Sequence, residues 1–358
     1  MTLTTPYYRD LIKEDYHEAG VFMTPYMMRV FSEGEYFEAD VTFPGLPAFK
    51  YLLNITTFNC GALRHDVVAR VLMTRVTGKC YKDVFNHLFE LITDNFGGFK
   101  KGDVILGITV DFSLAQANGI DASLKDGRKV LKGCRSVHFM RAVDRTISKV
   151  CISPEDSALF RKICIMIKEV SEKEEVSQLF GVLDYTFNIS EVFDAAKRFT
   201  QAELSMDRSH WTKSAEFVKW WNRERVLILL TDAYREMTDA DWNVASNNTN
   251  HVESLNRRSV VDTTTTTLHG QLSHMYREDR KRAFQHIASV NEVSRERQKS
   301  AKKRISSNST TNYVGRKIST TKGKNSRRRA ASQQRTADII KGKYVGQNSF
   351  FLLISKTP

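Results

Sequence analysis

The chain has 358 residues, a composition ordinary for a soluble protein and a formal net charge of +13. Its five cysteines are odd in number, lie far apart and form no Cys-x-x-Cys pair, which argues against a disulfide scaffold or a zinc ribbon. It has neither a run of about 18 apolar residues nor an N-terminal signal pattern, so we expect reduced thiols and no membrane partner.

Residues 1–34 are predicted to form an N-terminal segment that contains one short helix. From Tyr36 the sequence reads as strands, in three runs: YFEADVTF, FKYLLNITTFN and VVARVLMTRV. Pro44-Gly45 and Gly61 mark the breaks between them. The three runs are therefore expected to form an antiparallel meander.

Helices and strands are then expected to alternate. Residues 81–96 carry an apolar helical face and end at Gly97-Gly98. Residues 103–111 form a nearly continuous apolar run, typical of a central strand covered on both faces. A helix is predicted from Ser113 and a short strand over 128–131. This element order predicts an α/β, ribonuclease-H-like fold, a mixed sheet flanked by helices, whose first part spans 35–150.

The rest of the chain divides into an all-helical insertion, a last core helix and a tail. Residues 151–230 read as amphipathic helices, residues 231–262 return to the core, and residues 263–358 are predicted to be a basic, largely disordered tail. Residues 277–343 hold 20 Lys/Arg against 5 Asp/Glu, more than the net charge of the whole chain. The tail therefore indicates nucleic-acid binding or nuclear import, through the clusters Lys302-Lys303-Arg304 and Arg327-Arg328-Arg329.

Three carboxylates stand in unusual contexts. Asp40 interrupts ADVTF, Asp111 ends the apolar run GITVDF, and Glu253 lies in the helical NNTNHVESLNRR. Each has a plain alternative as a solvated surface residue. An ionised carboxylate at the end of an apolar strand is costly, however, unless it is paired or bound to a metal. Two strand aspartates and a distant helical glutamate are what a two-metal nuclease or polynucleotidyl transferase needs.

These segments resemble the DDE transposases of Mutator-like elements. The resemblance rests on ADVTF, FKYLLNITTFN, VDFS, GCRSVHFMR and NNTNHVESLNRR, which occur in the family's order and cover residues 36–258. It implies a catalytic core in which Asp40, Asp111 and Glu253 bind Mg²⁺ or Mn²⁺. It further implies cleavage of the element's ends and transfer to target DNA, in the nucleus. The chain starts close to the first catalytic strand. A truncated or inactive copy of such a transposase is therefore the alternative to an active one.

The resemblance also bears on His138 and Cys134. The family carries a Cys-x-x-His pair at this place, whereas the spacing here is Cys-x-x-x-His. His138 is a catalytic candidate, expected to contact the scissile phosphate or the end of the active-site strand. The alternative interpretation is that His138 is a structural histidine in the core. Two ligands do not complete a tetrahedral zinc site, so Cys134 is expected only to pack nearby.

Several alternatives stay open on the sequence. The four tryptophans are more easily read as core residues than as surfaces that stack on bases. A non-catalytic DNA-binding or chromatin protein would keep the fold without metal-dependent chemistry, and a host nuclease would hydrolyse DNA without strand joining. The sequence also leaves open whether the chain forms a homodimer.

Overall fold

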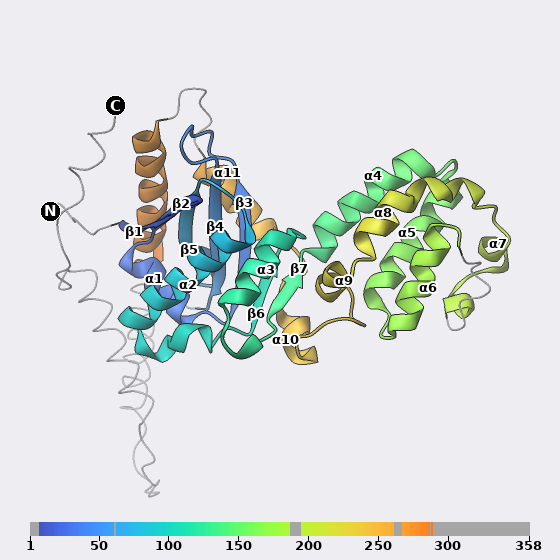
Figure 1. Cartoon of the computed structure of the whole chain (residues 1–358), viewed down its shortest axis with the longest axis horizontal. Coiled ribbons are helices and arrows are strands. Elements are labelled where there is room, and N and C mark those ends of the chain that lie inside the picture. Colours follow the sequence, from blue (N-terminus) through green and yellow to red (C-terminus); the bar gives the residue numbers. More distant parts are fainter. Residues whose placement is uncertain (1–6, 61, 187–194, 261–266, 287, 289–358) are drawn as a thin grey trace, which may run out of the picture.

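The computed structural model describes residues 7–60, 62–186, 195–260, 267–286 and 288. The chain is mixed α/β, with one seven-stranded mixed sheet flanked by helices and a helical lobe beside it (Figure 1). The strands are β1 (Tyr8–Glu14), β2 (His17–Phe22), β3 (Tyr36–Thr42), β4 (Tyr51–Asn59), β5 (Arg64–Met73), β6 (Gly107–Val110) and β7 (Leu131–Gly133). None of the described helices is long and apolar enough to cross a membrane.

The helices fall into two groups. Those that cover the sheet or join its strands are α1 (Pro25–Glu33), α2 (Gly78–Asn95), α3 (Leu114–Ser123), α10 (Asp239–Val244), α11 (Asn250–Ser259) and a helix over residues 268–286. The helical lobe contains α4 (Met140–Val150), α5 (Pro154–Glu169), α6 (Lys173–Leu183), α7 (Gln201–Leu204), α8 (Ala215–Trp221) and α9 (Glu224–Leu230).

The sheet has the strand order β1-β2-β5-β4-β3-β6-β7. Strands β3, β4 and β5 are antiparallel neighbours, as the three strand-like runs predict, whereas β6 and β7 continue the sheet parallel to β3. From Tyr36 onward, the observed order of three strands, helix, strand, helix, strand and helix is the predicted one. The prediction of a mixed sheet flanked by helices is confirmed.

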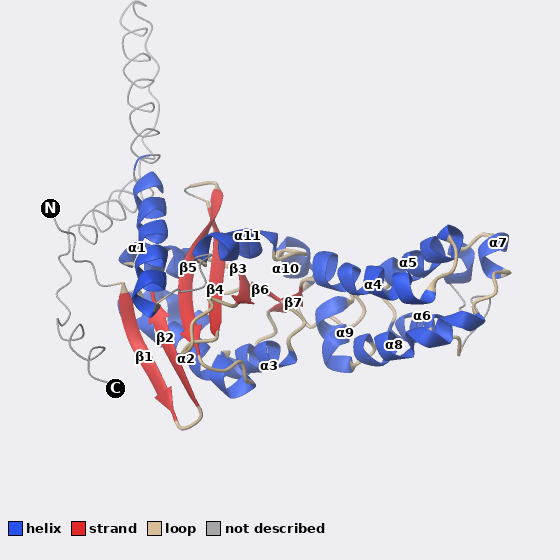
Figure 2. Ribbon diagram, turned by 90° about the horizontal axis from the view of Figure 1, so that it is seen from above, coloured by secondary structure: helices blue, strands red, loops and turns tan. Residues whose placement is uncertain are grey.

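Alternation along β3 sends its side chains to two different layers. Phe37 and Ala39 are buried in the main core beneath α1 and α2, whereas Glu38 and Asp40 lie on the opposite face with α11. Figure 2 shows helices on both sides of the strands. The polar face of β3 is therefore covered by the helix that carries Glu253.

The predicted boundary of the N-terminal segment is wrong. Strands β1 and β2 within residues 1–34 extend the same sheet, because β2 pairs with the free edge of β5. The polar edge strand YRDLIKE lacks the apolar alternation by which the later strands were recognised. Helix α1 matches the predicted short helix.

The predicted start of the tail is also too early. Residues 268–286 form a helix whose Met275 packs with Leu52 and Leu72 of the sheet. Its Asp279 forms a buried ion pair with Arg70 of β5, with a nitrogen–oxygen distance of 2.7 Å. The fold therefore extends to residue 286, and the rest of the predicted disordered tail lies almost wholly outside the described residues.

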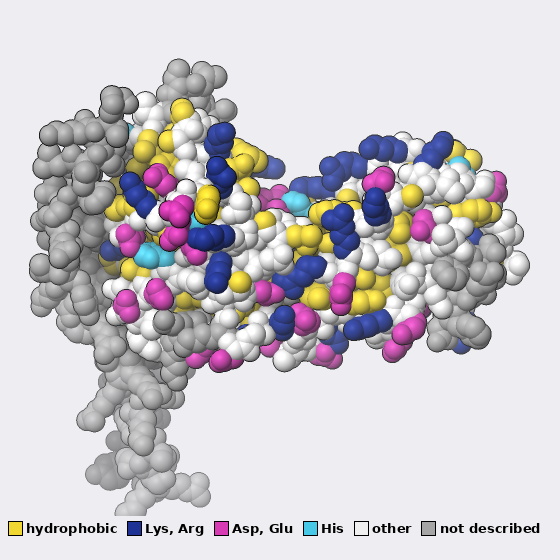
Figure 3. Space-filling view, viewed as in Figure 1, with side chains coloured by type: hydrophobic (Ala, Val, Ile, Leu, Met, Phe, Trp, Pro, Cys, Tyr) yellow, Lys and Arg dark blue, Asp and Glu magenta, His cyan; other side chains and the backbone are white. Residues whose placement is uncertain are grey.

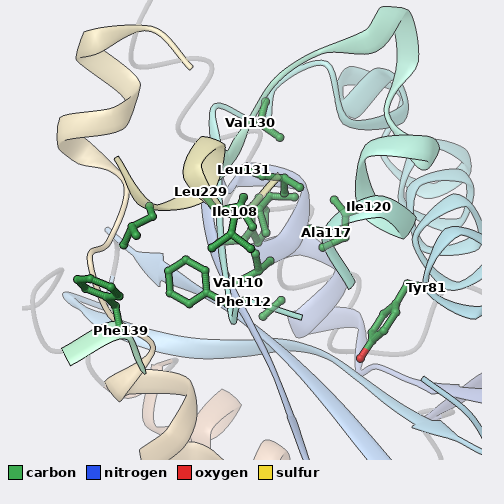
Figure 4. Close-up of a cluster of buried hydrophobic side chains, with 14 of the residues drawn as sticks. Tyr81, Ile108, Val110, Phe112, Ala117, Ile120, Val130, Leu131, Phe139 and Leu229 are labelled. Carbon is green, nitrogen blue, oxygen red and sulfur yellow. The ribbon is translucent and has the colours of Figure 1, made fainter. Parts of the chain in front are cut away.

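The helical insertion is present, and it begins with α4 rather than at residue 151. Its core is continuous with that of the sheet: Phe139 and Leu229 from the lobe side approach Val110 and Phe112 at the end of β6 (Figure 4). Trp221 packs edge-on against both phenylalanines. This packing fixes the lobe next to the carboxyl end of β6.

The tryptophans are mainly core residues. Trp211, Trp221 and Trp242 are buried, and Trp211 donates a hydrogen bond from Nε1 to Asp156 Oδ1 at 2.6 Å. Trp220 alone among the four is partly exposed, and the Arg223 guanidinium lies over its ring. The core interpretation holds for three of the four.

Candidate active site

Asp40 and Asp111 are brought side by side by the parallel pairing of β3 and β6. In that register Ala39 lies opposite Val110, so the next residue on each strand is an aspartate. Their carboxyl groups interact directly; Asp40 is buried and Asp111 is partly buried. The carboxyl ends of parallel strands are where open α/β sheets present ligand sites. The expectation that these two residues lie at neighbouring strands is confirmed.

Glu253 reaches the same place from the first turn of α11. The His138 Nε2 atom lies 3.0 Å from Asp111 Oδ1 and 3.2 Å from Glu253 Oε1. Because one nitrogen contacts both carboxylates, Asp111 and Glu253 are close enough to share a pair of metal ions. The structure thus gathers the three predicted carboxylates and His138 in one site.

A π-helical turn positions His138. The turn η3 (Arg135–Phe139) follows β7 directly, and the backbone N–H of His138 donates to the carbonyl of Cys134 at 3.1 Å. A π-helical turn holds one residue more than an α-helical turn and is frequent at functional sites. The longer Cys-x-x-x-His spacing is accommodated in this turn.

Asp40 is held by a chain of amides. The Asn256 side chain donates to Asp40 Oδ2 at 2.6 Å, and the backbone N–H of Val41 donates to Oδ1 at 2.8 Å. Asn54 in turn donates to Asn256, and Arg70 donates to Asn54 at 2.8 Å. The orientation of Asp40 therefore depends on the buried Arg70 and on α11.

The electrostatics of the site favour cations. Burial, followed by the charge of Asp111 and a hydrogen bond to it, raises the pKa of Asp40 to about 8. Burial also raises the pKa of Asp111, and the charge of Glu253 adds to this, while Asp40 and Arg141 act in the opposite direction. The Arg141 guanidinium lies 3.6 Å from Glu253 Oε2. The described basic residues in contact with the three carboxylates are one histidine and one arginine, so the site has less positive than negative charge.

These residues fit a site for hard divalent cations. The donors are carboxylate oxygens, which Mg²⁺ and Mn²⁺ prefer. Oδ1 of Asp111 is buried and accepts no well-aligned hydrogen bond from any described residue. An oxygen in that state gains most from a bound cation. Asp40, Asp111 and Glu253 would hold the ions.

Cys134 has a positioning role in this arrangement. Its thiol lies within 4.8 Å of donor atoms of Asp111 and His138, so these three residues form a further possible ligand group. The thiol is buried, however, and burial raises the pKa of Cys134. Its sulfur accepts a hydrogen bond from Thr249 Oγ1 at 3.4 Å, and that hydroxyl also lies 3.2 Å from Glu253 Oε1. Cys134 thus supports the start of α11.

Asp40→Asn is expected to stabilise the metal-free protein at alkaline pH. A folded-state pKa raised to about 8 means that the folded chain favours the neutral carboxyl, so stability is full below about pH 4 and falls as pH rises towards 8. At pH 8 the variant should be more stable by at least about 1 kcal/mol, the value of one pKa unit. Urea unfolding in EDTA at pH 5 and pH 8 measures this. Asp94→Asn, at an exposed position of α2, is the control, and an equal pH slope for wild type and Asp40→Asn would contradict the prediction.

Sequence reasoning missed three partners of the site. Asn256 lies one helical turn after Glu253, so helical spacing could have found it. Thr249 and Arg141 carry no such signal. Their contacts with Glu253 depend on where the start of α11 and the first turn of α4 lie in the folded chain. The predicted nucleic-acid-binding clusters, residues 302–304 and 327–329, lie outside the described residues.

Comparison of the chain with protein-family models, with curated proteins and with solved structures finds no match. Its function is therefore inferred from the geometry and chemistry of the site.

Proposed function

We propose that the chain is a metal-dependent DNA-cleaving and strand-transferring enzyme, with the catalytic core of a DDE transposase. The observation that carries the proposal is the meeting of Asp40, Asp111 and Glu253, which come from two parallel strands and from a helix; Glu253 lies 213 residues after Asp40 in the sequence. Surface carboxylates have no reason to converge in a buried site, where their mutual repulsion costs free energy. A divalent metal pair offsets that cost.

The topology supports this assignment. The element order β3-β4-β5-α2-β6-α3-β7-α4 matches the one expected for a ribonuclease-H-like fold, with the helical lobe inserted before the last catalytic helix. The three carboxylates lie at β3, at the end of β6 and on α11. On this reading β1, β2 and the helix over residues 268–286 are additions to the core.

The chain's own residues would divide the work of phosphodiester displacement. Bound Mg²⁺ or Mn²⁺ would activate the attacking hydroxyl and stabilise the leaving oxygen. Asp40 orients its carboxylate through Asn256, and must lose its proton before it can act as a ligand. His138 and Arg141 contact Glu253 and are partly exposed, so their N–H groups could donate to a phosphate.

A cationic row leads away from this site along α4. Arg141, Arg145 and Lys149 are exposed and four residues apart, so they share one face of the helix over about 12 Å. Lys and Arg side chains line this edge of the lobe over α4 (Figure 3). Asp144, the acidic residue between them, is paired with Arg161 at 2.6 Å. A row of this kind suits the phosphates of a DNA strand that enters the site.

Removing part of this row should weaken DNA binding. Arg145→Ala combined with Lys149→Ala is expected to lower duplex affinity and to flatten the salt dependence by roughly two in slope, since about two fewer counterions are released. Fluorescence anisotropy across a salt series measures both. Lys13→Ala with Lys79→Ala, at the β1 edge of the sheet, removes the same charge and should change little. If both double variants lost the same DNA affinity, the effect would come from the net charge of the chain and not from the row on α4.

Deleting residues 289–358 should also reduce non-specific DNA affinity. The segment carries 17 Lys/Arg and 3 Asp/Glu, and its removal eliminates the net positive charge of the chain. Cleavage in a single turnover at saturating DNA should change much less, because all three carboxylates remain. Loss of cleavage under those conditions would mean that the tail contributes to the active site.

The proposal is tested with the full chain and labelled duplexes in Mg²⁺ or Mn²⁺. Metal-dependent hydrolysis together with covalent joining of a 3′-hydroxyl end to a second duplex is the expected result. Hydrolysis without joining would favour a host nuclease of the same fold. DNA binding that is unaffected by EDTA, with no cleavage of any duplex, would favour a non-catalytic DNA-binding or chromatin protein and overturn the enzymatic proposal.

A further inference from the structure

A second cluster of potential metal ligands lies one step along the same elements. Glu38 precedes Asp40 by two residues on β3, and His251 precedes Glu253 by two residues on α11. His65 of β5 completes the cluster. Donor atoms of these three residues all lie within 4.8 Å of one another. No part of the proposed phosphodiester chemistry uses them.

Glu38 is the buried centre of this cluster. Only 3% of its side chain is exposed. His251 Nδ1 lies 3.0 Å from Glu38 Oε1, His65 Nδ1 lies 4.0 Å from the same oxygen, and the backbone N–H of Val252 donates to Oε2 at 3.3 Å. No described Lys or Arg pairs with Glu38. The cluster therefore lacks positive charge, and burying a carboxylate without a full cationic partner costs free energy.

The two histidines are already close together. Their rings are stacked with centroids 3.6 Å apart and planes 5° from parallel. Two nitrogens bound to one tetrahedral Zn²⁺ are separated by roughly 3.3 Å, given Zn–N bonds of about 2.0–2.1 Å. His65 Nδ1 is buried and has no hydrogen-bond partner among the described residues. This nitrogen lies 4.0 Å from Glu38 Oε1 and is a potential metal ligand.

We propose that Glu38, His65 and His251 form a site for a transition-metal ion of the zinc class. Two imidazoles and one carboxylate are a donor set for Zn²⁺, and imidazole nitrogen selects such ions over Mg²⁺. Because a metal lies in the plane of each imidazole ring, the stacked rings tilt apart when the ion binds. The ion links α11 to β3 and β5, and so clamps the helix that carries Glu253 onto the sheet.

Zinc binding to the full chain tests the site without any need for nuclease activity, so the inference stands apart from the proposed function. Equilibrium dialysis against Zn²⁺ should give about one ion fewer per chain for His65→Ala and for His251→Ala than for wild type. Glu38→Gln, which keeps the shape of the side chain and loses its charge, should weaken binding by at least about tenfold. His269→Ala, at an exposed histidine outside the cluster, should bind as wild type does.

A second set of variants separates this site from the candidate active site. Asp111→Asn and Cys134→Ser should leave the Zn²⁺ at the proposed site in place. Zinc lost with those variants, and retained in His65→Ala and His251→Ala, would overturn the proposal, as would a wild-type chain that binds none. If His65→Ala fails to fold, His251→Gln decides the matter, because His251 is half exposed.

Hydrogen exchange tests the clamp itself. Zn²⁺ should slow exchange of the amides of α11 in wild type and in His269→Ala, and should have no such effect in His251→Gln. Zinc that binds through His65 and His251 without protecting α11 would contradict the clamping role.

Discussion

Asp111→Asn is expected to lower metal-dependent DNA cleavage by about 10³-fold or more. The substitution removes a charged oxygen ligand from the shared site while keeping the size of the side chain, so the cost falls on metal binding and on the chemical step. Single-turnover cleavage of a labelled duplex in Mg²⁺ measures the rate. Duplex affinity should remain close to that of wild type, because Asp111 lies in the site and is no part of the cationic row on α4.

The matched control for this experiment is Asp103→Asn. Asp103 is exposed in the loop before β6, so the same chemical change there should leave cleavage unaltered. Both variants should unfold cooperatively, which excludes misfolding as the cause of any loss. Cleavage by Asp111→Asn at the wild-type rate would remove the basis of the transposase proposal.

Asp279→Ala is expected to lower the free energy of unfolding by about 3–5 kcal/mol, the usual cost of breaking a buried ion pair by removing one partner. Arg70 and Asp279 are joined by two hydrogen bonds, of 2.8 and 2.7 Å, and Tyr7 donates a third to Asp279 at 2.6 Å. Burial acts to lower the pKa of Arg70, but the charge of Asp279 raises it overall. The variant leaves a buried guanidinium without a counter-charge. Urea unfolding monitored by circular dichroism measures the loss.

Two comparisons define the origin of that loss. Asp239→Ala breaks an exposed pair with Arg235 and should cost less than about 1 kcal/mol. Arg70→Met combined with Asp279→Leu removes both charges, and should recover much of the stability lost in the single variant. An Asp279→Ala chain as stable as wild type would mean that the helix over residues 268–286 contributes little to the fold.

The strands of the core were predictable because their apolar runs are long and bounded by turn residues. Most of the apolar run before Asp111 forms the buried strand β6, which covers Gly107–Val110, and Asp111 lies in the site directly after it. The edge strand β1 could not be predicted, because edge strands carry polar residues at positions where central strands are apolar. The helix over 268–286 could not be separated from the basic tail by composition, because charged residues are frequent in it and its contact with the sheet rests on a few residues such as Met275.

The candidate site was predictable in its three carboxylates and His138, and helical spacing from Glu253 indicates Asn256. Their local contexts are unusual for their residue types, which is a signal within each segment. Arg141 in this site and His65 in the proposed zinc site have no such signal, since each depends on how a distant element is placed in space. Only the register of β5 against β4 and the course of α4 after its π-helical turn bring them near α11.

The helical lobe lies between β7 and α11 in the chain, and this has a consequence for synthesis. Asp40 and Asp111 are made early, but Glu253 emerges only after the whole lobe has been translated. Domains generally fold as units, and contacts of long sequence separation form late. A nascent chain would therefore hold two aspartates with no third ligand. The proposed site would gain its third carboxylate only once α11 had docked on the finished sheet.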